Sequence, residues 1–135
     1  MSLRLTATLV AGVLAACSSS APTDPAPDRL TVVNATPDTL VYGAGELEAS
    51  YRVDLQAEFP AGTLPDRVVL PGAAAAIPVE QISGYRAGAT LRFVFWRVQA
   101  GRARYRGSLD ATTTELARRG YRLEVTSAAL GPALP

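Results

Sequence analysis

Apolar and polar residues alternate along most of the chain from Arg29 onwards, and turn-forming residues interrupt the alternation about every ten residues. An alternation with a period of two is typical of β-strands, whose successive side chains point to opposite faces of a sheet. Pro, Gly, Asn and Asp gather between the alternating segments, and these residues favour turns. The pattern therefore predicts an all-β domain built from short strands.

The clearest pair of predicted strands covers Thr90–Gln99 and Arg102–Ala111, which flank Ala100-Gly101. A two-residue connection that contains Gly favours a β-hairpin. Large apolar residues occur on both faces of the first strand, with Leu91, Phe93 and Phe95 on one face and Val94, Trp96 and Val98 on the other. Both faces need cover, so we expect a central strand with Trp96 as a core anchor.

Further segments complete the predicted strand pattern. They are Arg29–Asn34, Thr39–Phe59, Arg67–Leu70, Ala73–Val79 and Tyr121–Ala128. The long segment Thr39–Phe59 is interpreted as one bent strand or as two strands, with Gly43 and Gly45 marking a bulge or kink. The two segments on either side of Pro71-Gly72 are predicted to pair as a second hairpin.

One short helix is predicted where Thr112 can cap a helix start, Glu115 can complete the capping box and Gly120 can end the helix. Seven or eight strands and one helix in about 100 residues match a β-sandwich of immunoglobulin-like type, with a small closed β-barrel as the alternative. The chain has a single Cys, so this sandwich would depend on packing without an internal disulfide. We expect the domain to span residues 29–128 and residues 129–135 to form a flexible tail.

Residues 1–16 have the composition of a secretory signal peptide. Arg4 supplies a positive charge, and Leu5–Ala16 is an uncharged, mostly apolar run. That run is too short to cross a bilayer, for which a helix needs about 20 apolar residues. The segment therefore predicts that the chain is exported.

Leu14-Ala15-Ala16-Cys17 resembles the lipobox of bacterial lipoproteins, in which Leu or a branched residue and two small residues precede an invariant Cys. The resemblance implies a thioether-linked diacylglycerol on Cys17, cleavage just before it, and usually acylation of the new amino group. Leu14, Ala15 and Ala16 would then be the residues that the signal peptidase recognises. Two or more acyl chains give lasting membrane attachment. The alternative is an ordinary signal peptide, cleaved after an Ala-x-Ala-like site.

Residues 17–28 connect the predicted anchor to the predicted domain. The segment Ser18–Asp28 is rich in Ser and Pro, a composition that disfavours both helix and burial and predicts a disordered tether. Partly extended at about 3 Å per residue, it would hold the domain roughly 30 Å from the membrane. Ser18, in place of Asp, directly follows Cys17, which favours the outer membrane in enterobacteria-like sorting.

The stretch Pro71–Arg97 also resembles small uncharacterised bacterial lipoproteins. The shared pattern is a Pro-Gly turn, an apolar strand, an Ile-x-Gly-Tyr turn and a strand that ends in an aromatic residue and Trp. These are turn and strand features, and the resemblance implies no known activity.

The residue types that the chain lacks exclude many kinds of site. It contains no His, its basic side chains are all Arg, and Cys17 is its single Cys. Ser-His-Asp and Cys-His catalysis, His-ligated metals, Schiff bases and P-loops all need residues that are missing. A formal net charge of +1 does not indicate a nucleic-acid partner. We expect no enzyme activity, no metal and no cofactor.

The leading functional hypothesis is a lipid-anchored envelope protein whose β-domain binds another envelope protein, or an anionic glycan or lipid, without catalysis. One alternative is a carboxylate-dependent hydrolase of envelope glycans that uses Glu46 and Glu48, two acids predicted to share a strand face. Pairing of these acids with arginines on neighbouring strands is the favoured explanation for them. A second alternative is a structural spacer without a specific ligand.

A row of arginines is the candidate binding site. Arg102, Arg104 and Arg106 alternate along one predicted strand, so their side chains are expected on one face about 7 Å apart, with Arg97 nearby across the hairpin. Guanidinium groups in such a row can bind phosphate or carboxylate groups of lipopolysaccharide, peptidoglycan or an anionic partner. The alternative is a solvated strand face that prevents edge pairing and forms ion pairs with acids on the neighbouring strand.

Overall fold

The computed structural model describes residues 26–50 and 57–132. The strands in these residues are β1 (Arg29–Asn34), β2 (Leu40–Glu46), β3 (Glu58–Pro60), β4 (Val68–Val69), β5 (Ala74–Pro78), β6 (Thr90–Gln99), β7 (Arg102–Thr112) and β8 (Arg122–Val125). The helices are α1 (Leu47–Ser50), α2 (Thr113–Arg118) and α3 (Ser127–Leu130), and the single 3₁₀ turns are η1 (Ala61–Thr63), η2 (Pro65–Arg67) and η3 (Val79–Gln81).

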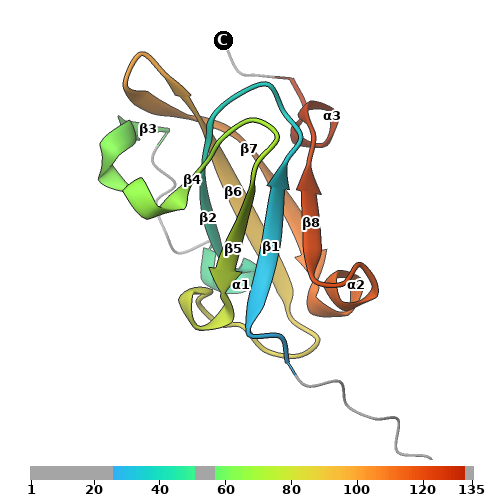
Figure 1. Ribbon diagram of the computed structural model, residues 1–135. Coiled ribbons are helices and arrows are strands. Elements are labelled where there is room, and N and C mark those ends of the chain that lie inside the picture. Colours follow the sequence, from blue (N-terminus) through green and yellow to red (C-terminus); the bar gives the residue numbers. More distant parts are fainter. Residues whose placement is uncertain (1–25, 51–56, 133–135) are drawn as a thin grey trace, which may run out of the picture.

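The strands form two sheets that pack face to face (Figure 1). The smaller sheet has the strand order β5-β1-β8, and the larger has the order β3-β7-β6-β2-β4. The prediction of an all-β sandwich with seven or eight strands and a short helix is thereby confirmed. Within the described part of the chain the two sheets stay separate and do not close into the alternative barrel.

The β6–β7 hairpin is the longest strand pair of the larger sheet. It runs antiparallel from Thr90 opposite Thr112 to Gln99 opposite Arg102. The connecting residues Ala100 and Gly101 both have positive φ, 50° and 73°, and a turn of this kind matches the twist of the two strands. On its other side β6 pairs with β2, so it is the central strand that its apolar faces predicted.

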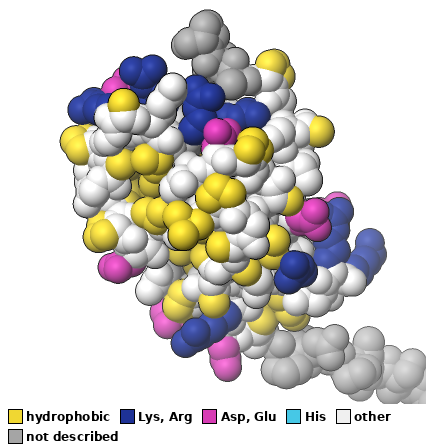
Figure 2. Space-filling model, turned by 45° about the horizontal axis from the view of Figure 1, so that its top comes forward, with side chains coloured by type: hydrophobic (Ala, Val, Ile, Leu, Met, Phe, Trp, Pro, Cys, Tyr) yellow, Lys and Arg dark blue, Asp and Glu magenta, His cyan; other side chains and the backbone are white. Residues whose placement is uncertain are grey.

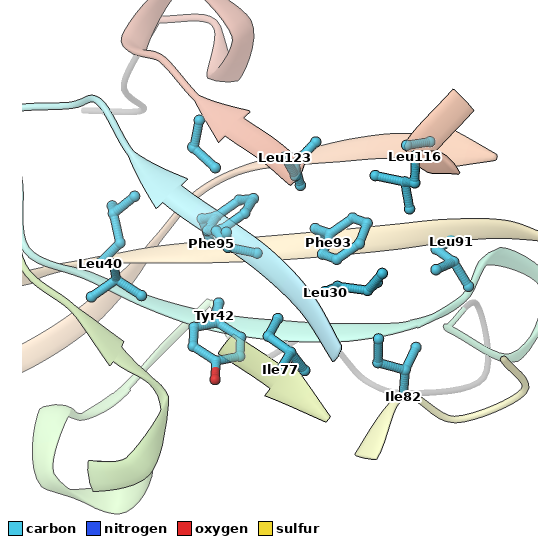
Figure 3. Close-up of a cluster of buried hydrophobic side chains, with 14 of the residues drawn as sticks. Leu30, Leu40, Tyr42, Ile77, Ile82, Leu91, Phe93, Phe95, Leu116 and Leu123 are labelled. Atoms are coloured by element: carbon cyan, nitrogen blue, oxygen red, sulfur yellow. The ribbon is translucent and has the colours of Figure 1, made fainter. Parts of the chain in front are cut away.

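The main core lies between the two sheets (Figure 3). Leu91, Phe93 and Phe95 project into it from β6 and are fully buried. Apolar residues of both sheets and of α2 pack around them, among them Leu30, Val32, Leu40, Tyr42, Ile77, Leu116, Leu123 and Val125. Burial of a large apolar side chain stabilises a fold by about 1.5–3 kcal/mol, so these contacts hold the two sheets together.

A second, smaller cluster covers the opposite face of the larger sheet. It consists of Val41, Phe59, Val94, Trp96 and Ala103, with Leu64, Val98 and Tyr105 packed against them. The rings of Phe59 and Trp96 meet edge to face with centroids 5.2 Å apart. Trp96 is 7% exposed, as expected of a buried anchor, but it anchors this outer cluster and not the core between the sheets.

The segment Thr39–Phe59 differs in part from its sequence interpretation. It contains two separate strands, β2 and β3, which agrees with the second of its two interpretations. The β2–β6 register is continuous through Gly43 and Gly45, so the predicted bulge at these glycines is wrong. Gly43 is instead a close-packing position, because a Cβ there would lie 3.4 Å from the Trp96 ring. After Glu46 the chain turns into α1, and residues 51–56 lie outside the described residues.

The second predicted hairpin is also wrong. Val68–Val69 pairs with β2 and Ala74–Pro78 pairs with β1, so the Pro71-Gly72 turn carries the chain from one sheet to the other. Asn34 holds this crossing in place at the end of β1. Its backbone N–H donates to the Ala73 carbonyl, its carbonyl accepts from the Gly72 N–H, and its buried amide donates to the carbonyls of Val69 and Asp38.

Both ends of α2 follow the sequence prediction. The Thr112 hydroxyl accepts from the Glu115 N–H at 3.1 Å, and the Glu115 carboxylate accepts from the Thr112 N–H at 2.9 Å. Two further short helices were not predicted, α1 after β2 and α3 at the end of the described chain. Between residues 26 and 132, as far as they are described, no helix is long and apolar enough for a membrane crossing.

The helix α3 lies in the segment where the sequence suggested the domain ends. Leu130 is buried in the main core beside Gly107 of β7. A Cβ at position 107 would lie 2.8 Å from the Leu130 carbonyl oxygen, so this close approach depends on Gly. The packed body therefore extends through residue 130, and residues 133–135 lie outside the described part.

Candidate functional site

Three of the four predicted arginines lie together at the free end of the β6–β7 hairpin. Arg97 of β6 is directly opposite Arg104 of β7, and Gln99 is opposite Arg102. Residues directly opposite in antiparallel strands project from the same face of the sheet. This face also bears Phe95, so the apolar face of β6 changes into a charged face at Arg97.

The third strand of the site is β3, at the edge of the sheet. Its residue Glu58 is opposite Arg104, so Glu58, Arg104, Arg97 and, on β2, Leu40 form one row across four strands. Leu40 belongs to the main core and is 1% exposed. The row therefore begins at the margin of the core and ends at the exposed sheet edge. We call Arg97, Arg102, Arg104 and Glu58 the hairpin-end cluster.

Glu58 forms ion pairs with two of the three arginines. Arg102 Nε donates to Glu58 Oε1 at 2.5 Å, and Arg104 Nε lies 3.6 Å from Glu58 Oε2. The hydrogen bond from Arg102 lowers the pKa of Glu58, and the positive charges of Arg102 and Arg104 lower it further. Glu58 is therefore ionised at neutral pH, and the predicted pairing of this row with acids on a neighbouring strand is present.

The cluster nevertheless carries excess positive charge. Three guanidinium groups and one carboxylate give a formal charge of 3 − 1 = +2. Arg97 forms no ion pair with any residue in the described ranges. Like charges placed directly opposite in an antiparallel pair destabilise that pair. The register that sets Arg97 directly opposite Arg104 is thus electrostatically unfavourable in itself.

Arg106 does not belong to this row, which corrects the sequence prediction. The register slips between Phe95 and Trp96, which are opposite Gly107 and Tyr105, so Arg106 is the extra residue of a β-bulge. Arg106 is 7% exposed as a residue, and its guanidinium donates to the Gly131 carbonyl at 2.7 Å and to the Ser127 carbonyl at 3.5 Å. This side chain fastens α3 to β7 and faces no open surface.

The two acids of the hydrolase alternative lie on different elements. Glu46 ends β2, whereas Glu48 is in α1, so the shared strand face predicted for them is wrong. The Glu46 side chain is 13% exposed and pairs with Arg86 at 3.0 Å. The Glu46 N–H also donates to the Ser83 carbonyl at 2.7 Å. Glu46 therefore holds the turn that contains Ser83 and Arg86 against the end of β2.

Figure 2 brings the top of the molecule forward. Hydrophobic side chains gather across the centre of the view. Basic side chains, with acidic ones beside them, lie around this centre, in the upper part of the view and also at its right and lower edges. Among the described residues, Leu70 and Val68 beside the inter-sheet turn are the large hydrophobic residues with the greatest exposure, at 60% and 37%.

Sequence reasoning missed Glu58 as part of the site. It appeared only as one of several acids in a long strand-like segment, and nothing local shows that β3 pairs with β7. The bulge at Arg106 did have a local signal. Gly107 interrupts the strand pattern, and a glycine inside a strand often marks a bulge.

The residues of the lipobox resemblance, Leu14, Ala15, Ala16 and Cys17, lie outside the described residues. Comparisons of the whole chain with protein-family models, with curated proteins and with solved structures find no match in any of the three.

Proposed function

We propose that this chain is a lipid-anchored protein of the bacterial cell envelope, in the outer membrane, whose β-domain is a non-catalytic binding module. Cys17 carries the lipid, and the tether of residues 18–28 connects it to the sandwich. The lipobox resemblance and the short apolar run before it support the anchor. The partner is another envelope protein or an anionic glycan or lipid.

The placement of the hairpin-end cluster is the observation that carries the binding role. The described chain enters β1 at one end of the sandwich, and the tip of the β6–β7 hairpin lies at the other end (Figure 1). A domain tethered through its amino-terminal side would present the hairpin end away from the attachment point. The charged surface with unbalanced arginines is at that far end.

The absence of catalytic activity has independent support from the residues. The chain has no His and no Lys, and its single Cys is assigned to the lipid. Glu46, the more buried of the two acids considered for hydrolysis, is held in an ion pair with Arg86 that positions a turn. Glu46 and Glu48, on different elements, do not form the pair on one strand face from which the hydrolase alternative was argued.

The anchor is tested by intact-mass analysis of the full chain after expression in a bacterium. We expect a polypeptide that begins at Cys17 and carries diacylglycerol, and that partitions into the membrane fraction. The matched control is Cys17→Ser, which removes only the thiol and should abolish both the added mass and the membrane association. An unmodified Cys17, or a different first residue, would contradict the anchor.

The binding role is tested by photo-crosslinking in intact cells. A photoreactive residue replaces Gln99 at the hairpin end or, as a control, Thr114 on α2 near the opposite end of the sandwich; both positions are exposed. We expect a discrete crosslinked product from position 99 and none from position 114. Equal labelling, or no labelling, at both positions would instead support the structural spacer.

A further inference from the structure

We propose that the hairpin-end cluster is a phosphate-binding site, in which Arg97, Arg104 and Arg102 surround a phosphate monoester group. This inference names the ligand class of the proposed binding module, and it rests on that binding role but not on the lipid anchor. The shared chemistry could come from a lipid headgroup or from a soluble phosphate compound.

The strand register places three arginine residues close together on one sheet face. Cβ atoms of directly opposite residues, here Arg97 and Arg104, are about 4.5–5.5 Å apart, and Arg102 is about 7 Å from Arg104 along β7. Guanidinium side chains are long enough to converge from these positions. Each presents a planar set of N–H donors that matches the oxygens of a phosphate.

Charge favours phosphate over a carboxylate as the ligand. A monoester carries a charge of about −1.5 to −2 at neutral pH and has three acceptor oxygens, one for each arginine. This charge matches the formal +2 of the cluster. A carboxylate has two oxygens, and Glu58 already supplies one carboxylate to Arg102 and Arg104.

The donors needed for the ligand remain available beside Glu58. Arg102 uses its Nε for the short hydrogen bond to Glu58, whereas Arg104 Nε is 3.6 Å from the carboxylate, beyond hydrogen-bond distance. The side chains of Arg102 and Arg104 are 46% and 56% exposed. Arg97 is partly buried at the margin of the main core, where a nearby apolar surface strengthens its attraction for an anion.

A bound phosphate would also relieve the repulsion expected between Arg97 and Arg104, which are directly opposite each other. In the free protein two like charges face each other across adjacent strands, and one carboxylate at the sheet edge compensates only part of that charge. A bound dianion between them would convert the repulsion into two favourable pairs. Relief of this repulsion would thus add to the free energy of phosphate binding.

The test uses the chain from residue 18 onwards, since every buried apolar residue of the described chain lies between Leu30 and Leu130. Binding is measured by NMR titration with glycerol phosphate, a soluble phosphate monoester, and by sedimentation with phosphatidylcholine vesicles that contain phosphatidic acid. Pure phosphatidylcholine vesicles are the lipid control. Binding in the first arm indicates recognition of the phosphate itself, and binding confined to the second indicates a lipid headgroup.

Three variants decide the outcome, each checked for an unchanged melting transition. Arg97→Gln with Arg104→Gln should weaken binding roughly tenfold or more, since two of the three charge-assisted contacts are lost. The matched charge control, Arg122→Gln on the exposed face of β8, should leave binding within about twofold. Glu58→Gln should strengthen binding several-fold, because it removes a competing carboxylate.

Two results would overturn the proposal. One is the absence of binding by the unsubstituted chain in both arms, and the other is a double variant that binds as well as Arg122→Gln does. Either result leaves the proposed function standing if position 99 still crosslinks in cells, because that experiment depends on the anchored protein and on no phosphate. A failure of the crosslinking with intact phosphate binding would contradict the envelope partner alone.

Discussion

The two ends of the β6–β7 hairpin use the same residue type in opposite ways. Near the start of β6, Arg92 is directly opposite Asp110, and two parallel hydrogen bonds of 2.8 Å join the guanidinium to the carboxylate. At the free end, Arg97 is opposite Arg104, and the acid of the row is one strand further away. The strand register thus pairs an arginine with an acid at the start of β6, where the two charges cancel. At the free end it pairs two arginines, and excess positive charge remains.

This difference teaches how to interpret arginines on a β-protein. The chain has nearly equal numbers of basic and acidic residues, 13 and 12, so by composition all but one of the arginines could be neutralised. Strand pairing determines which arginines are actually neutralised. An arginine directly opposite an acid forms a stabilising pair, as Arg92 does with Asp110, whereas two arginines directly opposite each other, as Arg97 and Arg104 are, keep excess positive charge on the sheet.

The largest expected effect on stability comes from a comparison of two substitutions on one face of β6, one in the main core and one at the charged hairpin end. Phe93→Ala should lower the free energy of unfolding by about 3–5 kcal/mol, because it leaves a cavity in the main core. Gln99→Ala, further along the same face, should change it by less than about 0.5 kcal/mol. Chemical denaturation measures both. Similar values for the two would mean that the hairpin end is not a solvent-exposed surface.

The second prediction separates Arg106 from the row to which the sequence assigned it. Arg106→Ala should destabilise the protein by about 1.5–3 kcal/mol, because the carbonyls of Gly131 and Ser127 lose a charged hydrogen-bond donor. Arg104→Ala should have an effect below about 0.5 kcal/mol. Hydrogen exchange at the amides of α3 gives a local measurement. Unchanged protection there in Arg106→Ala would contradict the fastening role.

The third prediction compares the ion pairs at the two ends by double-mutant cycles. Substitution of Arg92 and Asp110 by Gln and Asn should show a coupling energy of about 0.2–1 kcal/mol, and the pair of Arg104 and Glu58 should show a smaller one because its contact is longer. The hydrogen bond from Arg92 lowers the pKa of Asp110 below its ordinary value of 3.8. The contribution of the Arg92–Asp110 pair to the free energy of unfolding is therefore complete above pH 3.8. It is lost as the pH falls through the lowered pKa of Asp110.

The cycle is repeated at neutral pH and at a pH below the lowered pKa of Asp110, where its carboxylate is protonated. A coupling energy that persists unchanged in acid would show that the charge of Asp110 is not its source. A larger coupling for Arg104 and Glu58 than for Arg92 and Asp110 would reverse the comparison between the two ends.

The smallest effect concerns the repulsion between Arg97 and Arg104. At low ionic strength and without phosphate, Arg97→Gln should raise the free energy of unfolding by about 0.2–0.5 kcal/mol, since it removes one of two like charges. The gain should disappear in high salt, where the Debye length is about 3 Å. Thermal unfolding in the two conditions measures it. Destabilisation in low salt would show that Arg97 has a stabilising contact.

Local features of the chain were predictable because their causes are local. The alternation in Thr90–Gln99 predicted both the central strand and its two apolar faces. Thr112 and Glu115 predicted the helix start, since both hydrogen bonds of a capping box join residues three positions apart. The positions of the turns followed from Pro, Gly and Asn in the same way.

Features that join distant segments were not predictable. The segments around Pro71-Gly72 have the pattern of a hairpin, yet each pairs with a different sheet because Asn34 of β1 binds the turn from outside it. Glu58 becomes the partner of Arg102 only because β3 pairs with β7 across 44 positions of the chain. Neither relation leaves a periodic signal in the sequence.

The sequence by itself determined the class of the fold, the faces of the central strand and the types of chemistry that are closed to this chain. It did so because side-chain alternation, capping and residue composition act over a few neighbouring positions. The tertiary structure decided which arginines are neutralised and which are available. That choice depends on strand register and on the bulge at Arg106, which together set which charges face each other across the sheet.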